Sequence, residues 1–238
     1  MNLVLFRPEE IGKPLPIDDA RARHILTVLR NREGDSFDIG VVGGPRGKAT
    51  VMRVEPDRLV CTFHLGDPPP DLYTLTLLLG LPRPRVARRI LREATVLGVE
   101  RIVFAPAARG ERSYAHSRLW TTGEYVRHLE AGAQQAFSTL LPAVELPESL
   151  EAWLTALPPG AVRLALDNYE AEVRLAEAPL SSASCVLAVG PERGWSEEER
   201  ALLRREGFRL AGLGERVLSV EVACVAGVTL LLARMGHM

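Results

Sequence analysis

The sequence predicts an α/β protein with a mainly parallel sheet, preceded by a small β-rich domain. From residue 73 onward, short apolar runs alternate with helical patterns, and this alternation is typical of parallel sheets with helices on both faces. The first 66 residues instead contain short runs rich in β-branched residues, separated by turn sequences. Between the two patterns lies Asp67-Pro68-Pro69-Pro70-Asp71, a stiff segment that cannot join a central strand. We therefore expect a domain at 1–66, a linker at 67–72 and a second domain at 73–238.

The first domain is expected to be a small β-barrel with one helix. Its expected strands are 35–42, 47–54 and 58–65, with Gly-Gly-Pro and Glu-Pro-Asp turns between them. The helix precedes these strands, and either Asp18 or Asp19 can cap its N-terminus. Apolar residues follow at helical spacing, namely Ala22, Ile25, Leu26 and Leu29.

The second domain is expected to contain five main strands and five helical stretches. The strands are 73–79, 101–105, 162–166, 185–189 and 208–211, and the helical stretches are 85–97, 118–137, 149–157, 196–206 and 219–234. The helix at 85–97 has an apolar stripe for the core. Arginines lie around that stripe, namely Arg83, Arg85, Arg88, Arg89 and Arg92.

Composition is that of a globular protein, with 47% hydrophobic and 25% charged residues. The formal net charge of −1 does not indicate a nucleic-acid binder, although the middle third is mildly basic.

Cys61, Cys185 and Cys224 are far apart in apolar surroundings, so we expect buried, reduced thiols. The first residues lack the features of a signal peptide, and polar residues interrupt the longest apolar run, 217–233. These features favour a cytoplasmic protein, and no cluster with metal-ligand spacing is found.

Two Gly-bearing loops near the C-terminus suggest a ligand site. Gly190 ends an apolar strand, and Ser196 begins a helix with Glu199 three residues later, which is a capping box. Open sheets bind ligands at the carboxyl ends of their strands, where glycine lets the backbone approach a ligand closely. The stretch fits neither a Rossmann fingerprint nor a Walker loop. Taken alone, the glycines Gly190 and Gly194 are equally well explained by a tight turn.

The second loop, Leu213-Gly214, leads into the apolar C-terminal helix. Glu221 falls in the first turn of that helix, where a carboxylate favours the positive end of the helix dipole and needs no further role. Leu166-Asp167-Asn168 ends a third strand and is able to line the same crevice.

Both loops match sequence motifs. The first motif is an apolar strand followed by G-P-E-G-G, an apolar residue and S, and the second is L-G-x-R-x-L-R-x-E-T-A. Matching residues are Gly190, Pro191, Glu192, Gly194, Ser196, Leu213, Gly214, Arg216, Leu218, Glu221 and Ala223. The pair resembles the signature of the ribosomal small-subunit methyltransferase E family of the knotted SPOUT superfamily. Arg193 replaces a glycine of the family pattern, Ser219 an arginine and Val222 a threonine.

Weaker similarities extend the resemblance to nearly the whole chain. The stretch from His24 to Arg30 resembles the family's H-x-x-x-V-L-R, and Leu97-Gly98-Val99 resembles the end of K-A-T-E-L-G-V. Gln135 is retained from an E-Q-S-x-R segment, but Ser138 replaces its arginine.

The resemblance implies a PUA-like β-barrel that binds RNA, followed by an α/β domain with a deep trefoil knot that acts as a homodimer. It implies methyl transfer from S-adenosylmethionine to N3 of a uridine in 16S ribosomal RNA, without a metal. The implied cofactor residues are Leu166, Val189, Gly190, Gly194, Leu213, Gly214, Val217 and Leu218. Candidate catalytic residues are Glu221, Gln135 and Glu192. Candidate RNA-binding residues are Arg23, His24, Arg30, Arg83, Arg85, Arg88, Arg89, Arg109 and Arg112.

Two alternatives remain open from the sequence. Because Ser138 and Ser219 stand where the family has arginines, the chain is also compatible with a knotted RNA-binding protein that has lost catalysis. A third possibility is a related knotted enzyme that methylates another RNA position or a ribose 2′-hydroxyl.

Overall fold

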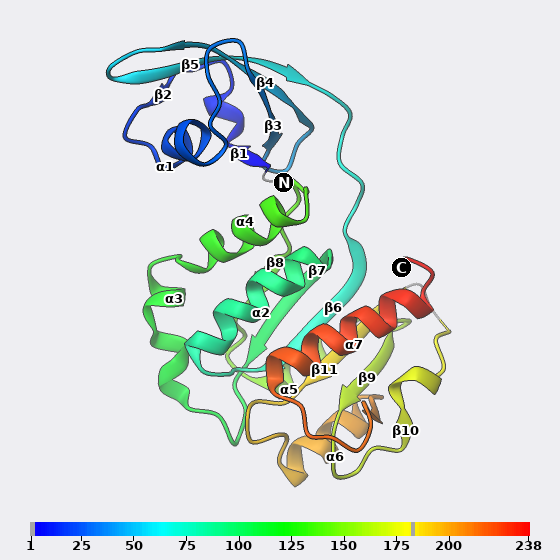
Figure 1. Cartoon of the computed structure of the whole chain (residues 1–238). Coiled ribbons are helices and arrows are strands. Elements are labelled where there is room, and N and C mark those ends of the chain that lie inside the picture. The colour runs from blue at the N-terminus through cyan, green and yellow to red at the C-terminus, as the bar shows by residue number, and fades with distance from the viewer. Residues whose placement is uncertain (1–2, 182–183) are drawn as a thin grey trace. The chain divides into compact units, whose positions relative to one another are not determined.

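A computed structural model describes residues 3–181 and 184–238 (Figure 1). The chain divides into two compact units. The first contains the residues up to Asp71 together with Ala133–Leu141, and the second contains Leu72–Gly132 and Pro142–Met238. Segment 133–141 therefore belongs to the first unit, although the residues before and after it belong to the second.

The first unit is built on a mixed five-stranded sheet in the order β1-β3-β4-β5-β2. Its strands are β1 (Val4–Phe6), β2 (Leu15–Pro16), β3 (Ser36–Val41), β4 (Arg46–Val54) and β5 (Arg58–Leu65). β1 pairs with β3 in parallel, and the other pairs are antiparallel. The three strands expected from β-branched runs are confirmed as β3, β4 and β5. Segment 133–141 is held here because the Thr139 hydroxyl donates to the Gly44 carbonyl at 2.6 Å.

The helix of the first unit changes its winding partway along. It starts as α1 (Ala20–Arg23), with Asp19 as N-cap accepting from the Arg21 N–H at 2.7 Å, and continues as the π-helix η2 (His24–Val28). Ala22 and Ile25 point into the core of the unit with Phe6 and Ile39. After the helix, Arg30 adopts a left-handed backbone with φ 59°. A short 3₁₀ helix, η1 (Pro8–Glu10), lies between β1 and β2.

The second unit contains a seven-stranded sheet in the order β10-β12-β9-β11-β6-β7-β8, and every pair is parallel. The strands are β6 (Tyr73–Gly80), β7 (Val99–Ala105), β8 (Ala143–Glu145), β9 (Val162–Leu166), β10 (Val173–Arg174), β11 (Cys185–Val189) and β12 (Arg209–Gly212). The expected α/β class with a mainly parallel sheet is confirmed. The central strand β11 is buried throughout, as a run of apolar residues predicts for a strand covered on both faces.

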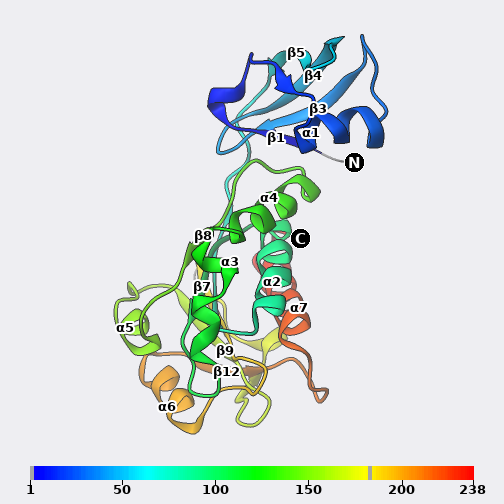
Figure 2. The same cartoon turned by 90° about the vertical axis from the view of Figure 1, so that its left-hand side faces the viewer.

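Helices cover both faces of this sheet (Figure 2). α2 (Pro84–Val96) and α7 (Val220–Arg234) pack together on one face, and α5 (Leu150–Thr155) and α6 (Glu197–Arg205) lie on the other. Neighbouring residues of β6 supply the two cores, because successive side chains of a strand point to opposite faces. Leu77 packs near Ile90 of α2, whereas Leu78 packs with Leu154 of α5.

The helical stretch expected at 118–137 is divided into two helices. They are α3 (Arg118–Thr121) and α4 (Tyr125–Gln135). Gly123 between them has φ 72°, a left-handed conformation that ends a helix. The hydroxyls of Thr121 and Thr122 also bond to carbonyls four residues earlier, at 3.2 and 2.7 Å. The short 3₁₀ helices η3 (Arg112–His116) and η4 (Leu175–Glu177) complete the unit.

Within the described residues, no helix is long and apolar enough to cross a membrane. The three cysteines are free thiols, with Cys185 and Cys224 buried and Cys61 partly buried. Burial raises the pKa of Cys61 to about 11 and that of Cys185 to about 12. Burial and the Glu221 charge also raise the pKa of Cys224 far above its ordinary range. Buried thiols of this kind are inert at neutral pH.

Candidate functional site

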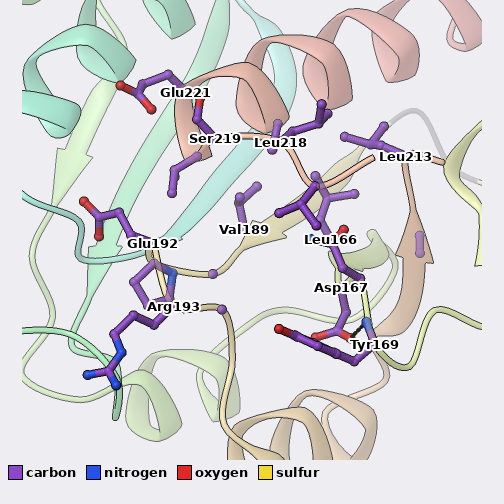
Figure 3. Close-up of a pocket in the computed structure, with 18 residues that line it drawn as sticks. Leu166, Asp167, Tyr169, Val189, Glu192, Arg193, Leu213, Leu218, Ser219 and Glu221 are labelled. Carbon is purple, nitrogen blue, oxygen red and sulfur yellow. Dashed lines mark hydrogen bonds between the residues drawn. The ribbon is translucent and has the colours of Figure 1, made fainter. Parts of the chain in front are cut away.

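A cavity of about 410 Å³ lies at the carboxyl ends of β9, β11 and β12 (Figure 3). These strands are neighbours, in the order β12-β9-β11, so the loops that follow them converge on one edge of the sheet. Such an edge is where open parallel sheets bind their ligands. The size falls within the ordinary range for small-molecule sites.

Seven of the eight cofactor residues expected from the sequence line this cavity. They are Leu166, Val189, Gly190, Gly194, Leu213, Val217 and Leu218. Gly214 is not among the lining residues, although it belongs to the same loop as Leu213 and Val217 and has φ 117°. Further lining residues are Asp167, Asn168, Tyr169, Pro191, Glu192, Arg193, Ala211, Ser219, Val220, Glu221 and Ala223.

The loop after β11 favours glycine at two positions for different reasons. A Cβ on Gly190 would lie only 3.0 Å from the Trp195 nitrogen and 3.1 Å from the Gly194 Cα, so the backbone that folds back over this position would have to shift to accommodate a larger residue. Gly194 has φ 68° and donates its N–H to the Pro191 carbonyl at 2.8 Å. The result is a small loop whose backbone faces the cavity.

The start of α6 anchors this loop. Ser196 and Glu199 form the expected capping box, with the Glu199 carboxylate accepting from the Ser196 N–H at 2.8 Å and the Ser196 hydroxyl accepting in return at 3.2 Å. The other oxygen of Glu199 accepts from the Ala108 N–H at 2.7 Å. Because Glu199 is buried, this carboxylate fixes the loop after β11 to the loop after β7.

The loop after β12 lines the cavity with apolar side chains, and one of them is largely exposed to solvent. Val217 is 81% exposed, and Ser219 acts as N-cap of α7 without a hydrogen bond from its side chain to the helix. Exposed apolar atoms in a concave site are favourable places for a ligand with apolar faces.

The loop after β9 contains an aromatic residue that the sequence analysis did not predict as part of the site. Tyr169 lines the cavity and is 78% exposed. Its backbone is fixed, because the buried Asp167 carboxylate accepts from the N–H groups of Tyr169 and Glu170, both at 2.8 Å. The signal for this turn was an Asp directly after a buried strand, since Asp often bonds to backbone two residues later.

Two of the three candidate catalytic residues lie at the cavity. Glu192 and Glu221 both line it, on the side nearest α2 (Figure 3). Glu192 accepts the N–H of Arg83, the N-cap of α2, at 3.0 Å, and Glu221 is paired with Arg89 at 3.4 Å. Gln135 ends α4 within segment 133–141 of the first unit.

Three of the six expected RNA-binding arginines of the second unit contact neighbouring groups through their side chains, namely Arg88, Arg89 and Arg109. Arg88 pairs with Glu124 at 2.8 Å, which holds the pKa of that carboxyl below its usual range. Arg109 donates to the Arg193 carbonyl at 3.0 Å, beside the cavity. The exposed arginines of this set are Arg83, Arg85, Arg89, Arg109 and Arg112. An ion pair leaves the remaining donors of a guanidinium able to bind phosphate.

The candidate RNA-binding residues of the first unit lie on or beside its helix. Arg23 ends α1 and donates to the Asp18 carbonyl at 3.0 Å. His24 begins the π-helix and is partly buried, and Arg30 is exposed. A π-helix and a non-glycine residue with positive φ are both features that concentrate at functional sites.

Comparison with known proteins agrees with this geometry. The family model of an RNA methyltransferase domain matches residues 69–232, so the chain belongs to this class of RNA methyltransferases. The chain is 34% identical to ribosomal RNA small subunit methyltransferase E of Treponema pallidum over 98% of its own length and 91% of that protein. It is 26% identical to ribosomal RNA small subunit methyltransferase E 1 of Borreliella burgdorferi, over 95% of each. The chain therefore belongs to the ribosomal RNA small subunit methyltransferase E family, as its motifs predicted.

Solved structures share the fold. The methyltransferase E of Neisseria gonorrhoeae, bound to S-adenosyl methionine, superimposes with a TM-score of 0.80 at 23% identity, covering 98% of each chain. A methyltransferase of Legionella pneumophila, in complex with the same cofactor, gives a TM-score of 0.79 at 18% identity, again over 98% of each chain.

Proposed function

We propose that the protein transfers a methyl group from S-adenosylmethionine to N3 of a uridine in the 16S ribosomal RNA of the small ribosomal subunit. The observation that carries this proposal is the cavity at the ends of β9, β11 and β12, where loops from both family motifs meet. Membership of the methyltransferase E family supports the same reaction.

The residues of the cavity fit such a donor. Leu166, Val189 and Leu218 offer apolar surface for an adenine ring, and the tight loop at Gly190 offers backbone groups to read its edge. Glu192 and Glu221 supply negative charge near one side, which suits the positive charges of a sulfonium and an α-ammonium group. S-adenosylmethionine supplies a methyl group on a sulfonium that is already a good leaving group.

The tasks left to the protein are alignment and handling of one proton. Holding two reactants in line contributes roughly 7–11 kcal/mol to lowering a barrier in favourable cases. When the methyl group arrives at N3, the N3 proton must leave, and a carboxylate at the cavity is suited to accept it directly or through water. Glu221 and Glu192 are the candidates for this role. Gln135 is proposed to hydrogen-bond the uracil edge.

RNA binding is assigned to both units. The target base must be unpaired or turned out of its stack to expose N3. Arginines on or near α2 and after β7 are proposed to bind phosphates, namely Arg83, Arg85, Arg88, Arg89, Arg109 and Arg112. The first unit is proposed to be a PUA-like barrel, domain 1–66, that binds RNA through Arg23, His24 and Arg30. In this assignment residues 67–72 form the linker and residues 73–238 the catalytic domain.

The finer architecture is proposed in the same way. The C-terminal segment is proposed to thread through a loop as a deep trefoil knot, an exception to the rule that chains are unknotted. A homodimer is supported by the exposed apolar side chains of α7. Val222 and Val225 of this largely apolar helix are 51% and 37% exposed, and exposed apolar surface is typical of protein interfaces. We place the protein in the cytoplasm, where ribosomal subunits are assembled.

Incubation with labelled S-adenosylmethionine and small subunits from a strain lacking the gene tests the proposal. Nucleoside mapping of the product is expected to recover the label as 3-methyluridine from 16S RNA. Label on a different nucleoside or on a ribose would favour a related enzyme with another target. Donor binding without transfer would favour an RNA-binding protein that has lost catalysis, for which Ser219 at the cavity and Ser138 are the supporting residues.

A further inference from the structure

Arg200 is a buried arginine that points from α6 toward the loops of the cavity. Its side chain is only 10% exposed, although it lies in the first turns of a helix whose neighbouring charged residues are mostly in solvent. Arg200 is not itself a lining residue, and it matches no position of the family motifs. A buried guanidinium is costly to desolvate unless its donors are satisfied, so its partners show what it holds in place.

These partners belong to two loops that both line the cavity and follow the neighbouring strands β9 and β11. Toward the loop after β11, Arg200 donates from Nη1 to the Trp195 carbonyl at 2.9 Å. Toward the loop after β9, it donates from Nε to Glu170 at 2.7 Å and pairs with Asp167 at 3.6 Å. One rigid, planar group therefore bridges two loops that are separated by more than twenty residues in the sequence.

Arg200 and the backbone of the loop after β9 use different oxygens of the same carboxylate. Asp167 uses Oδ1 for the N–H groups of Tyr169 and Glu170 and offers Oδ2 to Arg200. The guanidinium also lies 6.0 Å from the centre of the Tyr169 ring, within reach of a cation–π contact. Arg200 thus holds both the turn and the aromatic residue that faces the cavity.

The loop after β11 is held at the point where the tight turn ends. Trp195 directly follows Gly194, which lines the cavity, and its buried side chain is part of the core beneath. Its carbonyl is the acceptor for Arg200. Arg200 therefore links the segment that carries Gly194 to the segment that carries Tyr169.

We infer that Arg200 is a positioning residue for the methyl-donor site, which fixes the width of the cavity by bridging the loops after β9 and β11. The inference rests on the proposed function, because it assigns the cavity to the donor. A site held at its bound geometry binds more tightly, since less ordering is needed on binding. The effect of Arg200 should therefore appear in the affinity for the donor and not in the affinity for RNA.

Three variants test this role by calorimetric titration with S-adenosylhomocysteine. Arg200→Lys keeps the buried charge, but one ammonium cannot span all the acceptors. Arg200→Gln removes the charge, and Asp167→Asn/Arg200→Gln also removes the buried carboxylate that would be left unpaired, while the Asn oxygen still accepts from the turn. Each is expected to raise the dissociation constant for S-adenosylhomocysteine, by about tenfold for Arg200→Gln and less for Arg200→Lys.

The matched control is Arg205→Gln on the same helix, where Arg205 is exposed and pairs with Glu151 at 2.7 Å, away from the cavity. It should bind S-adenosylhomocysteine like the wild type. In steady-state assays, Arg200→Lys is expected to raise KM for S-adenosylmethionine while kcat at saturation and RNA affinity stay near those of the wild type. A purely structural role would instead lower the melting temperature without this split.

The outcomes separate this inference from the proposed function. Absence of S-adenosylhomocysteine binding by the wild type would contradict the proposed function itself. Wild-type binding with unchanged affinity in a folded Arg200→Lys protein would overturn the inference alone. Failure of all three variants to fold would also overturn it, because Arg200 would then be needed for the fold and not for the spacing of the site.

Discussion

Glu221 and Arg89 form an ion pair of 3.4 Å that joins the first turn of α7, at the edge of the cavity, to the exposed side of α2. The Glu221 side chain is 21% exposed and that of Arg89 is 58% exposed. The carboxylate is thus held at the cavity by a residue that is itself exposed to solvent. The same helix α2 also donates its N-terminal N–H at Arg83 to Glu192, so both carboxylates of the site depend on its position.

If Glu221 accepts the N3 proton, Glu221→Gln removes the base while keeping the shape of the side chain. We expect kcat to fall by about a hundredfold or more, as for other general bases, with little change in the affinity for S-adenosylhomocysteine. Glu215→Gln is the control, because Glu215 is exposed and does not line the cavity. Single-turnover methylation of small subunits gives the measurement. A Glu221→Gln enzyme with the wild-type rate would remove Glu221 from the reaction.

Gly194 and Gly160 form a matched pair for testing the cavity. Both have positive φ, 68° and 103°, and neither has an atom within 4 Å of an added Cβ. Replacement by Ala should destabilise each variant by roughly 1–2 kcal/mol through backbone strain. Only Gly194→Ala should also weaken binding of S-adenosylhomocysteine, because only Gly194 lines the cavity. Equal donor affinity in the two variants, measured by titration calorimetry, would contradict the assignment.

The arginines of α2 give a prediction about salt dependence. Replacing Arg85, Arg88 and Arg89 by Ala should weaken RNA binding and flatten its dependence on salt, by about 0.7 in the log–log slope for each lost phosphate contact with single-stranded RNA. A control variant removes three exposed, ion-paired arginines elsewhere, namely Arg101, Arg205 and Arg209. Filter binding at several salt concentrations compares the two. An unchanged slope in the α2 variant would reject these residues as RNA contacts.

The buried thiols predict a loss of stability in alkali. The pKa of Cys185 is raised by burial from 9.0 to about 12, so the unfolded chain loses this proton at lower pH than the folded chain. Its contribution is fully present below pH 9.0 and is lost as pH rises toward 12, with a slope of about 1.4 kcal/mol per pH unit. Cys185→Ala should therefore show a shallower fall in the free energy of unfolding between pH 9 and 11. Parallel curves for wild type and variant, from denaturant titrations, would disprove this.

Much of the fold was predictable because its signals are local. The parallel sheet follows from strands and helices that alternate along the chain, and the start of α6 follows from Ser196 and Glu199, three residues apart. The carboxyl ends of β9 and β11 were predictable as lining the cavity, because Leu166 ends one apolar run and Gly190 directly follows another. Such signals need no knowledge of distant partners.

The remainder depends on contacts between distant residues. Tyr169 and Arg200 are thirty-one positions apart, and only the tertiary fold brings that ring and guanidinium together. The break between α3 and α4 was missed because a single Gly123 within an apolar pattern does not reveal its φ. The edge strands β8 and β10, of three and two residues, are too short to show a periodicity.

The most direct test of the central claim is calorimetric titration of the wild-type protein with S-adenosylhomocysteine, alongside Gly190→Ala. An added methyl group at position 190 would lie 3.0–3.1 Å from the backbone of Gly194 and Trp195, so the loop must shift to accommodate it and donor binding should weaken. We predict one molecule bound per chain for the wild type and a higher dissociation constant for Gly190→Ala. No binding by the folded wild type, or equal binding by both proteins, would contradict the assignment of this cavity to the methyl donor.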